Sequence, residues 1–435
     1  MKKCLLVLFA ISLILPALGN AGNVSSRYDV TFGGYVKFDL GFTSQNGNAD
    51  ASTAARSSTS SRKVLADEYG NTFMTGGETR FNFLVKGPAL WGAKTSAFIE
   101  GDFRGVTTGN QYGGFNLRHA FMKLNWPSAE LIAGQAWQQW GMPYYGAWMG
   151  VGDVTEYLRG IRVPQIALRY FFTKEFNAMF GLTSATEWSG ANNYYANGVR
   201  GWNDGFARSS WPGFEGEIAY WTDRCGKIGP NNLKFALGGY YGKDNSTSAT
   251  YLTATGNDYR DDTINAWVAA FRYSIPIVPE RQGNKAMSVL LNGNFFIGQD
   301  IAGNNWLGTA GLSEGSYQRP AGDRAAPTAF GLFTQASWWI TNRLSLNGMY
   351  GYLKYNYSGY GRSNTAAARD RINMSQTYAA NLLWDANQAI RFGIEWIRNF
   401  SGYNGYGTPA ASVGTGNADR TGVADMYRFG AWYFF

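Results

Sequence analysis

Few side chains in this sequence could act as nucleophiles, general bases or haem ligands. The one histidine is His119, and the two cysteines are Cys4 and Cys225. A membrane-embedded acyl hydrolase needs a serine near the imidazole, and its motif has that serine two residues on, where this chain has Phe121. No CxxCH haem-attachment motif occurs either. We therefore expect no catalytic site, no metal and no cofactor, and we expect His119 on the outer face of its strand.

The remaining reactive groups are charged, and charged groups can select solutes by sign. The chain has 38 Lys and Arg against 30 Asp and Glu, together 16% of its residues. That share is below the roughly 25% usual in soluble domains. The basic residues form no run of the kind that binds nucleic acid, so we expect no nucleic-acid partner.

The first 21 residues have the pattern of a secretory signal peptide. Lys2 and Lys3 precede an apolar stretch, 5–15, and small residues follow it around a cleavage site near Gly19 or Ala21. Removal of this segment leaves Cys225 as the single cysteine, so no disulfide can form within the chain. It also leaves 36 basic against 30 acidic residues, a net charge near +6. We expect residues 22–435 to form a single domain.

The mature chain alternates apolar and polar residues with period two. One clear case is the segment 373–384, where Met374, Tyr378 and Leu382 share one face and Asn373, Ser375, Thr377 and Asn381 share the other. The longest apolar run after the signal segment is six residues, 266–271, whereas a spanning helix needs about 20. Secreted strands with one apolar and one polar face predict an all-β, up-and-down transmembrane barrel in the bacterial outer membrane.

Short turns and long polar loops alternate between the predicted strands, and their number predicts the size of the barrel. Seven short turns are predicted near 87–92, 127–128, 173–175, 224–231, 276–285, 341–343 and 385–387. Eight longer loops are predicted near 44–74, 105–114, 138–162, 186–210, 244–260, 300–325, 358–370 and 402–421. Together these connections join sixteen antiparallel strands, with no remainder for a plug domain. Short turns belong on the periplasmic side and long loops outside the cell.

A barrel of sixteen strands encloses an aqueous lumen that something must narrow. The third loop, about 138–162, is rich in Trp, Tyr and Gly and carries Asp153 and Glu156. We expect it to fold into the lumen and to face basic residues on the wall. Strand parity turns eight basic residues inward: Lys37, Arg80, Lys86, Lys94, Arg104, Lys234, Arg272 and Arg428. It turns five acidic residues inward with them: Asp39, Glu100, Asp102, Glu215 and Glu217.

Four stretches of the first 185 residues resemble the trimeric sixteen-stranded porins, both the general diffusion porins and the dicarboxylate-type, DcaP-like subgroup. They are ETRFNFLVKG (Glu78–Gly87), AFIEGDFRG (Ala97–Gly105), NLRHAFMKL with AGQAW (Asn116–Leu124 and Ala133–Trp137), and IRVPQIALRY (Ile161–Tyr170). A final strand that ends on Phe435 also resembles the sorting signal of outer-membrane barrels. We expect no N-terminal coiled coil of the dicarboxylate type, because the first predicted strand begins within about ten residues of the expected cleavage site.

The resemblance implies a constriction with basic residues on the wall and acidic residues on the third loop. Carried over to this chain, the basic side is Arg80, Arg118 and Arg162, joined by Lys37 from strand parity. The acidic side is Asp153 and Glu156 on the loop, with Glu100 and Asp102 on the wall. Arg162 shares the parity of Ile166 and Leu168, so it faces the lumen only if Pro164 resets the alternation. Arg169 is the substitute otherwise.

The sequence therefore predicts a homotrimeric porin in outer-membrane lipid, a passive channel for small hydrophilic solutes and ions. Near balance of the inward charges predicts a weak anion preference. A structural or adhesive barrel without an open channel is the alternative. An open lumen, measurable as conductance, distinguishes the two.

Overall fold

The computed structural model describes residues 28–45, 70–105, 113–150, 157, 162–184, 211–246, 262–301, 317–318, 324–357, 372–403 and 421–435. Their regular structure is β. Among them, no helix is long and apolar enough to cross a membrane. The predicted signal peptide lies outside the described residues.

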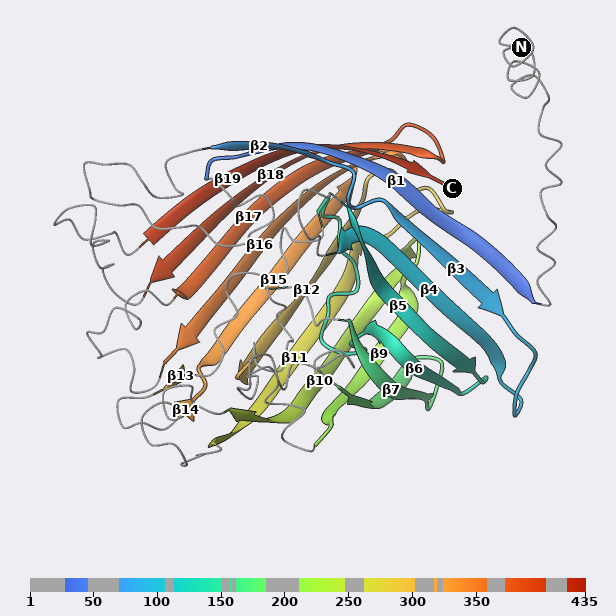
Figure 1. Cartoon of the computed structure of the whole chain (residues 1–435). Coiled ribbons are helices and arrows are strands. Elements are labelled where there is room, and N and C mark those ends of the chain that lie inside the picture. Colours follow the sequence, from blue (N-terminus) through green and yellow to red (C-terminus); the bar gives the residue numbers. More distant parts are fainter. Residues whose placement is uncertain are drawn as a thin grey trace, which may run out of the picture.

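Seventeen strands form one closed antiparallel sheet (Figure 1), in which strands pair with their neighbours in chain order except at β1, which pairs with β19, β2 and β3. Closure is made by β1 and β19, whose register runs from Tyr35 opposite Phe434 to Thr43 opposite Met426. A separate two-residue hairpin, β13 and β14, lies outside this sheet. The strands are β1 (Asp29–Thr43), β2 (Asn71–Thr75), β3 (Arg80–Lys86), β4 (Lys94–Gly105), β5 (Gly114–Asn125), β6 (Ala129–Trp137), β7 (Arg162–Phe171), β8 (Phe176–Thr183), β9 (Gly213–Ile228), β10 (Asn231–Ser246), β11 (Asp262–Val278), β12 (Ser288–Gln299), β13 (Tyr317–Gln318), β14 (Arg324–Ala325), β15 (Thr328–Trp339), β16 (Leu344–Asn356), β17 (Ile372–Asp385), β18 (Ile390–Tyr403) and β19 (Thr421–Phe434).

The prediction of sixteen strands is confirmed, with one strand broken in two. Both β2 and β3 pair with β1, β2 along Asp39–Thr43 and β3 along Asp29–Tyr35, so together they occupy one position in the barrel. Four residues, 76–79, separate them. The predicted loop 44–74 overlaps this position, because β2 already begins at Asn71.

The two faces of the sheet differ as the alternation predicts. Large apolar side chains on the outer face are exposed, for example Val36 at 55%, Ile166 at 57% and Ile394 at 58%. Their neighbours in sequence are buried on the inner face, where polar side chains such as Ser375 and Thr377 are fully covered. A barrel whose apolar surface points outward and whose polar groups point inward suits a lipid solvent.

All seven predicted short turns are present at one end of the barrel. They join β3 to β4, β5 to β6, β7 to β8, β9 to β10, β11 to β12, β15 to β16 and β17 to β18. Two of them are shorter than predicted, because β9 continues to Ile228 and β11 continues through Pro276 to Val278.

The chain end completes the closure. The backbone of Phe435 exchanges two hydrogen bonds of 3.1 Å with Gly34, and the Phe435 ring stacks on Phe32 at 5.2 Å. The last residue therefore takes part in the pairing of β1 with β19 that closes the barrel, which we call the seam.

Candidate functional site

A network of charged side chains lies on the inner face of β3, β4 and β5. The Arg118 guanidinium donates to Glu100 and to Asp102, each at 2.7 Å. Arg80 lies 3.8 Å from the same Glu100 carboxylate and 5.3 Å from the centre of the Tyr35 ring. Strand alternation places these groups together, because Arg80 stands opposite Asp102 in the register of β3 and β4. Three of the predicted wall residues, Arg80, Glu100 and Asp102, thus meet around the predicted Arg118.

A second network begins at Lys37 on β1. The Lys37 ammonium lies 2.9 Å from Asp39, and it donates to Glu78 as well. Glu78 also accepts a bond of 2.8 Å from Arg104. It comes from the break between β2 and β3, which turns its carboxylate inward and buries it. Strand parity could not identify Glu78 as an inward residue, because alternation predicts no direction for a residue that lies between two strands.

His119 is on the inner face, so the prediction of an outer position is wrong. The register of β4 and β5 shifts between Glu100 and Gly101, which adds one residue to β5 at Arg118. A bulge of this kind places two consecutive side chains on one side of the sheet. His119 therefore stands opposite Glu100, buried among the rings of three inner-face residues, Phe98, Phe121 and Trp137.

Strand parity did not decide which of Arg162 and Arg169 faces the lumen, and the structure places the two side chains in different surroundings. No reset occurs at Pro164, since β7 pairs continuously with β6 from Arg162 to Tyr170. Arg162, at the first position of β7, lies over the Trp137 ring at 5.0 Å. Arg169 is buried on the inner face and contacts Glu217 at 3.2 Å, away from Arg118. Arg169 therefore faces the interior. Arg162 keeps the parity of the outward Ile166, but its guanidinium lies over Trp137, which lines the cavity described below, and Arg118 is its main charged neighbour.

The segment 138–150 contacts inner-face side chains of strands far from β6. The Met149 carbonyl accepts from Lys37 of β1, and the Met149 N–H donates to Glu395 of β18 at 2.9 Å. The Tyr145 carbonyl accepts from Asn292 of β12 at 2.9 Å, and the Ala147 N–H donates to Gln335 of β15 at 3.3 Å.

Small residues on the opposite wall make room for this segment. A Cβ at Gly393 would lie 2.9 Å from the Met149 sulfur, and one at Gly351 would lie 2.4 Å from the Tyr157 ring. Tyr157 is fully buried there, and its hydroxyl bonds with Ser375 at 2.8 Å. Asp153 and Glu156, the predicted acidic side of the constriction, lie outside the described residues.

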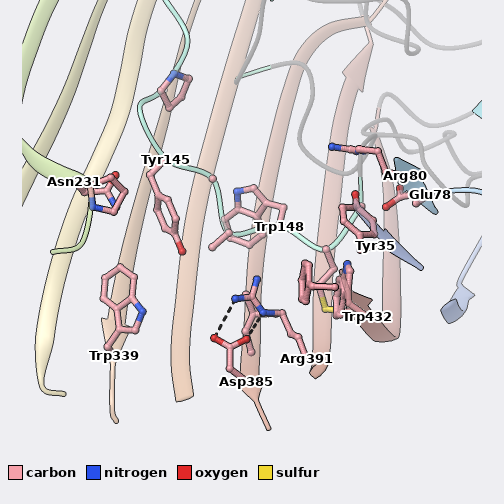
Figure 2. Close-up of a pocket in the computed structure, with 18 of the residues that line it drawn as sticks. Tyr35, Glu78, Arg80, Tyr145, Trp148, Asn231, Trp339, Asp385, Arg391 and Trp432 are labelled. Carbon is pink, nitrogen blue, oxygen red and sulfur yellow. Dashed lines mark hydrogen bonds and ion pairs between the residues drawn. The ribbon is translucent and has the colours of Figure 1, made fainter. Parts of the chain in front are cut away.

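A cavity of about 700 Å³ opens beside the segment, at the end of the barrel that carries the short turns. Figure 2 shows Asn231 at one side of it and Glu78 with Arg80 at the other, with Tyr145 and Trp148 between them. An Asp385 and Arg391 ion pair, 2.6 Å at its closest, borders the cavity too. The lining combines rings with charges: Tyr35, Glu78, Arg80, Arg118, Trp137, Tyr145, Trp148, Trp339, Asp385, Arg391, Trp432 and Phe434.

Charge pairing at the cavity is uneven. Glu78, Glu100 and Asp102 each contact a cation within 3 Å. In contrast, the Arg80 Nε, and one terminal nitrogen of Arg162 beside the cavity, are buried without a hydrogen-bond partner in the described part of the chain. These donors favour an anion locally, whereas Asp39 Oδ1 and both Glu215 carboxylate oxygens lack a partner elsewhere on the described inner wall.

Comparisons with known proteins agree with this architecture. No protein-family model matches the sequence, and no curated protein matches it either. Solved structures do match. The outer membrane channel DcaP of Acinetobacter baumannii is similar at a TM-score of 0.64 and 16% identity, with 94% of this chain and 97% of that chain covered. The chain has the fold of the outer-membrane porins.

Two further structures share the porin fold. The anion-selective porin from Comamonas acidovorans matches at a TM-score of 0.55 and 13% identity, over 94% of this chain and all of that one. The trimer form of OmpT from Vibrio cholerae matches at 0.52 and 10% identity, with the same coverage. A porin fold with an apolar outer face is the structure of a bacterial outer-membrane protein.

Proposed function

We propose that this protein is a passive, non-catalytic channel for small hydrophilic solutes and ions. The observation that carries the proposal is the charged interior: Arg80 and Arg118 line a cavity of about 700 Å³ beside the segment 138–150. A barrel that served only as a scaffold or adhesin would have no need to hold ionised side chains in its interior, where desolvation is costly. In this proposal the cavity forms part of a polar path through the barrel.

The constriction is formed, in this proposal, by the third loop and the wall facing it. Its basic side is Lys37, Arg80, Arg118 and Arg162, and its acidic side is Glu100 and Asp102 on the wall with Asp153 and Glu156 on the loop. The contacts of Met149 with Lys37 and Glu395 support this assignment, because they hold the loop segment against the inner face. The unpaired donors of Arg80 and Arg162 support a weak anion preference.

Single-channel recording in a planar bilayer tests the proposal. We expect stable conductance steps, and in a tenfold salt gradient a reversal potential that reports anions permeating more easily, by less than about tenfold, or roughly 1.4 kcal/mol of barrier difference. The absence of conductance steps from correctly folded protein would favour the structural or adhesive alternative.

A homotrimer is the expected assembly. The outer faces of β1, β3, β4 and β5 carry aromatic rings in contact with one another, including a tilted pair, Phe32 with Phe83, and a stacked pair, Phe81 with Phe115, which suit an apolar contact between barrels. Gly34 adds a small residue to the outer face of β1, whereas Gly33 stands opposite the inward Asn82 and does not contribute to that face. Ala93, a small residue near the same strands, does not add to this surface, because it is fully buried in the turn before β4. Native mass spectrometry that shows only monomer in mild detergent would contradict the trimer.

A further inference from the structure

A second cluster of cations lies on the inner wall, away from Arg118. It contains Arg169 of β7, Lys234 of β10 and Arg272 of β11, and we call it the Arg272 cluster. Arg169 and Arg272 both contact one carboxylate, Glu217 of β9. In the described part of the chain, Glu217 is the sole carboxylate within 4.0 Å of any of the three. Glu215 lies two residues away on the same face, and the Asp223 carboxylate acts on Lys234, so the geometry of the donors, and not an excess of positive charge, has to attract an anion here.

Aromatic rings fix the geometry of this cluster. The Arg272 guanidinium lies 4.1 Å from the centre of the Tyr144 ring, and the Lys234 ammonium lies 5.2 Å from that ring and 5.8 Å from the Trp221 ring. Cation–π contacts of this kind orient a cation without neutralising it. Arg272 is only 8% exposed, and among the residues that the structure describes its Nε has no hydrogen-bond partner.

The Tyr144 hydroxyl can serve as a donor. It accepts a hydrogen bond of 3.2 Å from the Trp221 Nε1, so its own proton points elsewhere. Burial raises the pKa of Tyr144, which keeps the phenol protonated. The Lys234 ammonium lies 5.2 Å from the centre of the same ring, so a phenol donor and an ammonium donor are available in one region for an oxyanion.

The cluster borders the cavity described above. The Lys234 ammonium is partly exposed and lies 3.4 Å from the Pro230 carbonyl, and Pro230 lines the cavity. Arg272 donates to the carbonyl of Met142, another lining residue, at 3.0 Å. The cations themselves do not line the cavity, so an anion that leaves it past Pro230 meets the partly exposed Lys234 at the edge of the cluster.

We propose that Lys234 and Tyr144, backed by Arg272, form a binding site for small oxyanions such as phosphate or a carboxylate. The site lies at the periplasmic mouth, separate from the Arg80 and Arg118 constriction, and it rests on the proposed channel function. An anion that has passed the constriction pauses here before it leaves the barrel.

Titration of inorganic phosphate at constant ionic strength and pH 7, during single-channel recording in potassium chloride, tests the site. For the wild-type channel we expect a saturable decrease of the chloride current. Lys234→Gln and Tyr144→Phe should each raise the half-saturating phosphate concentration by about fivefold to tenfold, as expected for the loss of one charge-assisted hydrogen bond. Lys234→Arg should restore most of the effect.

Lys227→Gln is the matched control, because Lys227 is an exposed lysine on the same hairpin, outside the cluster and the cavity. It should leave the phosphate titration unchanged. A conducting wild-type channel without saturable phosphate inhibition overturns the site and leaves the channel proposal intact. Equal shifts in the Lys227 and Lys234 variants also overturn it. A protein that does not conduct at all overturns the proposed function itself.

Discussion

Lys37 of β1 donates a hydrogen bond to the backbone carbonyl of Met149, 112 residues further along the chain. The same ammonium contacts Asp39 and Glu78, and all three side chains are nearly completely buried. One lysine thus joins the first strand, the break between β2 and β3, and the segment 138–150. Its removal should affect both the stability of the barrel and the position of that segment.

Lys37→Met tests this joint role. We expect the free energy of unfolding to fall by about 3–5 kcal/mol, because the substitution leaves two buried carboxylates without their shared cation. We also expect greater current noise from the freed segment. Urea unfolding in detergent and single-channel recording measure the two effects. Lys86→Met is the control: Lys86 forms an exposed ion pair with Asp29, so its loss should cost under about 1 kcal/mol. Equal losses in the two variants would contradict the role of Lys37.

Replacement of Arg80 and Arg118 together by Ser tests the selectivity. The change removes two cations from the cavity wall and leaves Glu100 and Asp102 there. We expect the reversal potential in a tenfold salt gradient to shift toward cations and the conductance to rise. Arg398→Ser is the control, since Arg398 pairs with Asp425 on the outer face of β18. An unchanged reversal potential in the double variant would show that these arginines do not form the constriction.

The terminal ring should matter for assembly. Phe435→Ser removes the stacking on Phe32 at the seam between β1 and β19, although the backbone bonds to Gly34 can persist. We expect less folded protein in the outer-membrane fraction, measured as the heat-modifiable band on a gel. Phe330→Ser provides the comparison, because Phe330 is equally exposed, 51% against 50%, but lies on β15. Equal yields for the two variants would exclude a special role of the terminus.

Cysteine labelling on intact cells tests the topology. Ser58 lies in the predicted external loop 44–74, and the native Cys225 is exposed at the end of β9, near a short turn. In a Cys225→Ser background, a cysteine at position 58 should react with a bulky, impermeant maleimide from outside. Cys225 of the wild-type chain should react only after the outer membrane is broken. The reverse labelling pattern would show that the barrel has the opposite orientation in the membrane.

Amino-terminal sequencing of the outer-membrane form tests the signal peptide, which we propose is 1–21. The mature chain should begin within two residues of Asn20 or Gly22. An intact Lys2 and Lys3 at the amino terminus would contradict cleavage.

Local pattern was enough to predict the barrel. Successive side chains of a strand point to opposite faces of the sheet, and this holds for any neighbouring strand. The outer position of Ile166 and the inner position of Thr377 therefore follow from the period-two alternation of apolar and polar residues. The number of turns then fixes the number of strands. Parity also placed Arg80, Glu100 and Asp102 on the same face, because neighbouring strands pair in register.

Only the tertiary structure decided which inward side chains contact one another. The bulge at Arg118 moved His119 to the inner face, and a bulge depends on the partner strand as much as on the residues within it. Glu217 draws Arg169 and Arg272 into one cluster, although they come from different strands. Met149 meets Glu395 across 246 residues. The sequence by itself determined which face each strand side chain occupies, since that depends on local geometry. Which charges become neighbours depends on closure of the barrel and on the path of one loop, which join segments that no local pattern relates.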